Sequence, residues 1–144
     1  MLDSFNNEDQ SDTKNAFIAR EHINSLCLGG RIQINPHIQI DYRKGWATLI
    51  EELIDVIKKY PIEIKEISSD YGQLDVNFYC IEKTQELRIW RAIDEARNQS
   101  RHVCSECGET GMRKIRGDKV IVICRACIRK AEDNGVTGTW LDKY

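Results

Sequence analysis

Two hydrophobic periods alternate along the first hundred residues of the chain. The three- and four-residue spacing of a helix face occurs in residues 13–28, 45–60 and 84–101. The two-residue period of a half-buried strand occurs in residues 31–42, 62–67 and 74–78. This order predicts an α+β fold, in which helices pack on a small, mostly antiparallel sheet.

The strongest helix pattern begins at Gly45 and ends before Pro61, because proline cannot continue a helix. Its apolar side is formed by Trp46, Leu49, Ile50, Leu53, Ile54 and Ile57. We expect Asp12 or Thr13 to cap the first helix and the glycine pair that starts at Gly29 to end it.

The last of these helices is predicted over residues 84–101. One face of it gathers Leu87, Trp90, Ile93, Ala96 and Arg97. We therefore predict that Trp90 lies in the core, as does Trp46.

Two features interrupt the strand pattern. Pro36 lies inside residues 31–42 and has no N–H to donate, so this stretch predicts two short strands or one interrupted edge strand. Residues 68–73, which include Gly72, separate the next two runs and are predicted to be the loop of a hairpin.

The composition is that of an ordinary globular protein, since 41% of the residues are hydrophobic. No run of about 18 apolar residues exists, so we expect no membrane span. Residues 1–15 hold four acidic side chains, one lysine and no apolar signal core. We therefore expect a loose segment over residues 1–13 and a cytoplasmic, reducing location.

The net charge of −2 conceals a division along the chain. Residues 97–130 carry nine basic and three acidic side chains, which gives that segment +6 and the rest of the chain −8. Such an asymmetry favours interaction with a charged partner and says little about the fold.

Two Cys-x-x-Cys motifs carry the strongest chemical signal. The first pair is Cys104 and Cys107, and the second is Cys124 and Cys127. The 16 residues between the pairs match the spacing of a four-cysteine zinc site. Four thiolates fill a tetrahedral shell and leave no position for water, so we predict one structural Zn²⁺.

Other uses of the cysteines fit the sequence less well. Disulfides need an oxidising compartment, and a redox Cys-x-x-Cys motif would open a helix after a core strand and would not occur twice. Cys27 and Cys80 have no partner at ligand spacing and lie among apolar residues. We expect both to be small core side chains.

The residues around the motifs predict a compact module. Two strand-like runs, residues 112–115 and 119–123, flank a turn, and a short helix is predicted over residues 125–134, before Gly135. Knuckle, hairpin and helix in this order resemble a treble-clef zinc finger. The chain then divides into a loose segment (1–13), a body (14–101), the zinc module (102–135) and a tail (136–144).

Seven basic residues and one tryptophan are candidates for partner binding: Arg113, Lys114, Arg116, Lys119, Arg125, Arg129, Lys130 and Trp140. They suit phosphates or an acidic protein surface. A solvated exterior is the plainer alternative, because zinc with four thiolates carries about −2, which basic neighbours offset. Trp140 either folds back on the body or anchors a partner.

The sequence offers no catalytic constellation, and we expect a protein that is not an enzyme. His102 lies near Cys104, but four cysteines complete the shell, so we expect a surface histidine at a helix end. His22 and His37 are expected to be ordinary surface or rim residues. A treble-clef nuclease needs histidine and asparagine where the predicted hairpin and helix supply Lys, Arg and Ile.

Several short motifs between Gly45 and Cys127 carry a resemblance. They are Gly45-Trp46 with its helix, Ile64-Lys65-Glu66-Ile67, Tyr71-Gly72-Gln73-Leu74, Phe78-Tyr79, Ala96-Arg97, Ser100, and Cys104, Cys107 and Gly108. With them the chain resembles a group of small uncharacterised bacterial and phage proteins with a Gly-Trp helix, a Gly-x-Leu hairpin and a C-terminal zinc finger. It departs from the group at Ser68-Ser69-Asp70, where the group has a lysine-containing turn. The resemblance implies a phage or mobile-element origin and no particular activity.

Two functional hypotheses follow. The first is a non-catalytic zinc-binding protein whose basic module contacts the phosphates of nucleic acid. The second is a protein-binding inhibitor or adaptor, such as a phage protein that occupies the nucleic-acid channel of a host defence complex. The net charge of −8 outside residues 97–130 and the resemblance motivate the second hypothesis.

Overall fold

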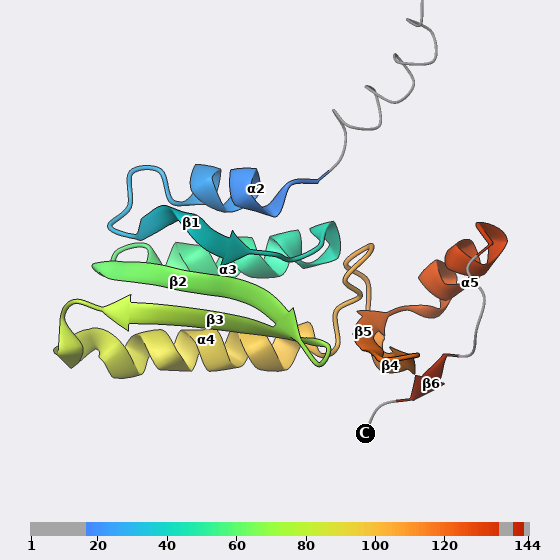
Figure 1. Ribbon diagram of the computed structural model, residues 1–144. Coiled ribbons are helices and arrows are strands. Elements are labelled where there is room, and N and C mark those ends of the chain that lie inside the picture. Colours follow the sequence, from blue (N-terminus) through green and yellow to red (C-terminus); the bar gives the residue numbers. More distant parts are fainter. Residues whose placement is uncertain (1–16, 136–139, 143–144) are drawn as a thin grey trace, which may run out of the picture.

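A helix-covered sheet and a smaller C-terminal module make up the chain, of which the computed structural model describes residues 17–135 and 140–142 (Figure 1). The body contains α2 (Ala19–Leu26), β1 (Gln33–Ile40), the 3-10 helix η1 (Lys44–Trp46), α3 (Ala47–Ile57), β2 (Ile62–Asp70), β3 (Gln73–Cys80), the 3-10 helix η2 (Lys83–Gln85) and α4 (Glu86–Ser100). The module contains β4 (Met112–Arg116), β5 (Lys119–Ile123), α5 (Arg125–Asp133) and β6 (Leu141–Asp142). The predicted loose segment and the Asp12 or Thr13 cap lie outside the described residues.

The body sheet has the order β1-β2-β3, with β1 parallel to β2 and β2 antiparallel to β3. Alternate side chains of β2 and β3 are buried, among them Ile62, Ile64, Leu74 and Val76. They share one core with the apolar side of α3 and with α4. The predicted α+β fold with small, mostly antiparallel sheets is confirmed.

β1 is an edge strand of this sheet. Its pairing with β2 shifts register between Ile34 and Gln39, and Pro36 lies inside the shift. The missing N–H of proline is tolerated at such an interruption. The prediction of an interrupted edge strand is therefore confirmed.

The β2–β3 hairpin has a tighter turn than predicted. β2 continues to Asp70 and β3 starts at Gln73, so residues 68–70 belong to a strand and not to a loop. Tyr71 and Gly72 form the turn, with φ of 52° and 76°. Two left-handed residues match the twist of the flanking strands, which allows a two-residue connection.

The predicted inner face of α4 is confirmed at Ile93 and Ala96 and wrong at Leu87 and Trp90. Its buried residues are Ile89, Ile93, Ala96 and Ser100, whereas Leu87 is 61% exposed and Trp90 41% exposed. The two stripes share Ile93 and Ala96, and the buried one differs by Ile89 in the first turns and by Ser100 at the end, where a small side chain lies against β3. Trp90 packs its ring on Phe78, with centroids 4.9 Å apart. Trp46, by contrast, is buried as predicted.

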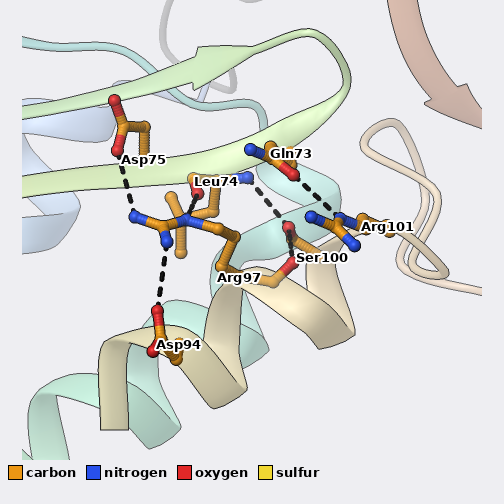
Figure 2. A network of polar contacts seen from close by, with 7 residues as sticks. All are labelled: Gln73, Leu74, Asp75, Asp94, Arg97, Ser100 and Arg101. Atoms are coloured by element: carbon orange, nitrogen blue, oxygen red, sulfur yellow. Dashed lines mark hydrogen bonds and ion pairs between the residues drawn. The ribbon is translucent and has the colours of Figure 1, made fainter. Parts of the chain in front are cut away.

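A polar network fastens the end of α4 to the start of β3 (Figure 2). Its members are Gln73, Leu74, Asp75, Asp94, Arg97, Ser100 and Arg101. The buried Ser100 hydroxyl accepts from the Leu74 N–H at 2.8 Å and donates to the Arg97 carbonyl at 2.6 Å. Arg97 donates to the carboxylates of Asp75 and Asp94 at 3.3 and 3.1 Å. Because residue 102 follows directly, the network also fixes where the C-terminal module begins.

We expect Ser100→Ala to lower the free energy of unfolding by about 1–3 kcal/mol, because the substitution leaves the buried Leu74 N–H without its acceptor. Urea unfolding monitored by circular dichroism measures the change. Ser25→Ala is the control, since the Ser25 hydroxyl is exposed and donates only to the His22 carbonyl within its own helix. An equal effect of the two substitutions would contradict the role given to Ser100.

His22 is not the ordinary rim residue that we expected. Its Nδ1 lies 2.6 Å from the Tyr42 hydroxyl and its Nε2 lies 3.0 Å from a Glu51 carboxylate oxygen. Burial raises the pKa of Tyr42, whose hydroxyl also donates to the Ala19 carbonyl. These contacts join α2 to the body through residues far apart in sequence, so the sequence could not reveal them.

The two cysteines outside the motifs pack as small side chains. Cys80 is buried, and its thiol contacts the Glu82 carbonyl at 2.9 Å. Cys27 is half-buried against the core, and this burial raises its pKa to about 11. Neither belongs to the cysteine cluster described below.

Candidate metal centre and basic groove

The first cysteine pair lies on a tight turn after α4. The Cys104 N–H donates to the Glu109 carbonyl at 2.7 Å, and the Gly108 N–H donates to the Cys104 carbonyl at 2.9 Å. Gly108 has φ of 86°, a left-handed conformation that suits glycine. An isolated bridge between Val103 and Thr110 closes the turn, which we call the knuckle (residues 103–110).

The second pair lies where β5 gives way to α5. Cys124 is the residue before the first turn of α5, and its Sγ accepts from the Cys127 N–H at 3.4 Å. The hairpin and the helix therefore occur where the sequence predicted them. The helix ends before Gly135, which has φ of 89°.

The four motif cysteines converge on one point. The Sγ atoms of Cys104, Cys107, Cys124 and Cys127 all lie within 4.8 Å of one another. The Cys107 and Cys124 sulfurs are 3.6 Å apart. Zn–S bonds of about 2.3 Å in a tetrahedron place sulfurs about 3.8 Å apart, whereas a disulfide needs about 2.05 Å. The residues present therefore form a group that could hold one metal ion.

The electrostatics of the four thiols favour a bound cation. A hydrogen bond from the Cys127 backbone N–H lowers the pKa of Cys124 to about 7. Burial, followed by contacts with the other three thiols, raises the pKa of Cys127 well above its usual range. Four neighbouring thiolates repel one another, and a divalent cation at their centre removes that penalty.

The knuckle is seated on η1 of the body. The Gly45 N–H donates to the Ser105 carbonyl, and the Trp46 indole N–H donates to the Val103 carbonyl, both at 2.9 Å. A Cβ at Gly45 would lie 2.2 Å from the Cys104 carbonyl oxygen, so only glycine permits this approach. The module is thus packed against the body directly beside Cys104, the first of the motif cysteines.

The β4–β5 hairpin also packs against the body. Val122 of β5 is buried and belongs to the body core. The tip of the β2–β3 hairpin meets the same side, because a Cβ at Gly72 would lie 3.0 Å from Val120 and 3.2 Å from Arg113. The Arg113 guanidinium donates to the Tyr71 carbonyl at 3.4 Å. Arg113, predicted to bind a partner, therefore faces the body.

The other basic residues of the hairpin lie on its opposite face. Paired residues of an antiparallel ladder share a face, and β4 and β5 pair Lys114 with Ile121 and Arg116 with Lys119. This face looks away from the core residue Val122. The sequence cluster on the hairpin is therefore divided between two faces.

The basic residues of α5 are divided as well. Cys127, Lys130, Ala131 and Asn134 lie on one side of the helix and line a groove. Arg125 and Arg129 are exposed and, four residues apart, lie on the other side of α5. Of the α5 cations predicted to bind a partner, only Lys130 reaches the groove.

The groove holds about 800 Å³ between the knuckle, the β4–β5 sheet and α5. We call it the basic groove, and it is lined by Arg43, Lys44, Glu106, Cys107, Arg116, Lys119, Ile121, Ile123, Cys127, Lys130, Ala131, Asn134 and Trp140. The sequence pattern did not predict Arg43 and Lys44 as lining residues, because they come from the body, more than 60 residues before the hairpin. Arg43 forms an ion pair with Glu106.

Trp140 folds back on the module. β6 pairs with β4, so that Leu141 lies opposite Ile115 and Asp142 opposite Lys114. The Trp140 ring is half-buried, with the Arg116 guanidinium carbon 5.6 Å from its centroid. Among the side chains of the described residues, Arg116 Nε and Trp140 Nε1 are buried donors without a hydrogen-bond partner. Residues 136–139 and 143–144 of the predicted tail lie outside the described residues.

The three histidines lie outside the cysteine cluster. His102 and His37 are exposed, and His102 follows α4 directly.

Within residues 17–135 and 140–142, no helix is long and apolar enough to cross a membrane. Comparisons of the chain with family models, with curated proteins and with solved structures found no match.

Proposed function

We propose that the protein is a non-catalytic zinc protein that binds nucleic acid through its C-terminal module. The convergence of four cysteine sulfurs within 4.8 Å, beside a groove lined by five cationic side chains, carries the proposal. Four thiolates leave no ligand position for water or substrate, so the ion holds the module together and performs no chemistry. The module is then a treble-clef-like zinc finger with one structural Zn²⁺.

Charge supports a polyanionic partner. Of the lining residues, five are basic and one is acidic, and the acidic Glu106 is already paired with Arg43. The rest of the chain outside residues 97–130 has a net charge of −8, which directs a polyanion to the module. Phosphates are the natural partners of clustered Lys and Arg at such a site.

Fluorescence polarisation with labelled DNA and RNA oligonucleotides tests the proposal at two salt concentrations. Four phosphate contacts to a single strand predict an affinity about fiftyfold weaker at 200 mM than at 50 mM salt. Binding that does not change with salt, or no binding at 50 mM, would rule the proposal out. The metal-loaded full chain is used throughout, so that a missing ion cannot explain a negative result.

A second candidate is a protein-binding inhibitor or adaptor of phage or mobile-element origin. The net charge of −8 outside residues 97–130 favours it, because acidic side chains can take the place of phosphates in a basic channel of a host complex. A pull-down from nuclease-treated host lysate tests it. Recovery of a stoichiometric protein partner would support this candidate, and recovery of none would exclude it.

A further inference from the structure

The basic groove combines two kinds of wall. Cations enter it from three separate segments: Arg43 and Lys44 before and in η1, Arg116 and Lys119 on the hairpin, and Lys130 on α5. Between them lie the apolar side chains of Ile121, Ile123 and Ala131 and the ring of Trp140. A phosphate alone would need only the cationic side chains, and an apolar peptide would need only the apolar ones.

The size of the groove limits what can enter it. About 800 Å³ is the volume of a small-molecule pocket, which can accept an extruded nucleotide but not the width of a double helix. A duplex keeps its bases inside the stack, so only its phosphates could cross the mouth of the groove. An unpaired strand, by contrast, can place a base on the apolar wall and its phosphates on the cations.

Two donors at the groove lack acceptors. Arg116 Nε and Trp140 Nε1 are buried and make no hydrogen bond within the described part of the chain. They belong to neighbouring side chains, since the guanidinium carbon of Arg116 is 5.6 Å from the Trp140 centroid. A buried donor without a partner is costly, so a shift of either side chain that brings its donor to an oxygen of an incoming base or phosphate is favoured.

We infer that the basic groove binds single-stranded nucleic acid, with an unpaired base against Trp140 and Ile121 and the adjoining phosphates on Lys119 and Lys130. The inference rests on the proposed function and deepens it, because it selects unpaired strands over duplexes. The outer face of α5, with Arg125 and Arg129, takes no part in it.

The test is polarisation titration of the metal-loaded full chain with a twelve-nucleotide single strand and with a blunt, fully paired duplex of the same strand and its complement. We expect the single strand to bind about tenfold more tightly. Trp140→Ala should weaken single-strand binding about tenfold, with little effect on the duplex, because stacking contributes only to unpaired bases. Trp140→Phe, which keeps a ring, should retain most of the affinity.

A matched pair of charge reversals locates the site. Lys119→Glu with Lys130→Glu should weaken single-strand binding at least tenfold more than Arg125→Glu with Arg129→Glu, although both change the net charge equally. Metal content confirms that each variant is folded. Equal losses of affinity in the two double variants, or equal affinity for single strand and duplex, would overturn the inference that the groove binds an unpaired strand. The proposed function would be unaffected. No binding of either probe by the wild-type protein would overturn both.

Discussion

Cys104→Ser is expected to abolish metal binding and to unfold the C-terminal module. Cys104 is fully buried, and its sulfur is one of the four that converge on the cluster. Zinc contributes an apparent free energy of about 10–16 kcal/mol to the folding of zinc-finger peptides, and a module of this size has little core of its own. Limited proteolysis should therefore cut the variant within residues 102–135, where the wild-type protein is resistant.

Cys27→Ser is the matched control for that substitution. Cys27 lies outside the cluster and is half-buried at the end of α2. The control should keep one metal ion per chain and the resistance of the module to protease. If Cys104→Ser retained both properties, the cysteine group would not be the metal site.

Gly45→Ala is expected to be the most damaging substitution outside the cysteines. The added Cβ would lie 2.2 Å from the Cys104 carbonyl oxygen and 2.4 Å from the Ser105 carbonyl carbon. The nearest atoms all belong to the backbone of Cys104 and Ser105, so no flexible side chain can move aside, and we expect a loss of about 3 kcal/mol or more in the free energy of unfolding. The metal affinity should fall as well, because the knuckle that carries two ligands must shift.

Gly117→Ala separates this steric effect from the general cost of replacing glycine. Gly117 has φ of 66° and no atom within 4 Å of an added Cβ, so its replacement costs only the backbone strain of about 1 kcal/mol. Urea unfolding and a competition titration for zinc compare the two variants. A Gly45→Ala protein no less stable than Gly117→Ala would contradict the described packing of the knuckle on η1.

The C-terminal module was largely predictable because its signals are local. The spacing of the two cysteine pairs, the glycines after the first pair and the alternation on either side of Gly117 all act over a few residues. The structure has the hairpin and the short helix at those places. The convergence of four sulfurs then follows from the connectivity of the module.

The inner face of α4 could not be read from periodicity alone. Ile89 and Trp90 are adjacent and both apolar, so either can begin a helical stripe. The choice is made by β3, whose edge N–H at Leu74 is satisfied by Ser100 on the same side as Ile89. The orientation of α4 thus depends on the polar residue Ser100, which the hydrophobic pattern does not indicate.

The groove could not be predicted because it is assembled from distant segments. Sequence proximity placed Arg113 with Lys114 and Arg129 with Lys130, yet strand alternation and helix rotation separate these neighbours. Arg43 and Lys44 join the site only because Gly45 lets η1 approach the knuckle. The positive charge of the module was therefore predictable, whereas its arrangement was not.

Mass spectrometry of the purified wild-type chain, first under native and then under denaturing conditions, tests most directly whether the four motif cysteines hold one zinc ion. We predict a native mass that exceeds the apo mass by one zinc ion, which is lost on denaturation to leave six reduced cysteines. A chain without metal, or one whose mass shows disulfides among the four motif cysteines, would contradict the account.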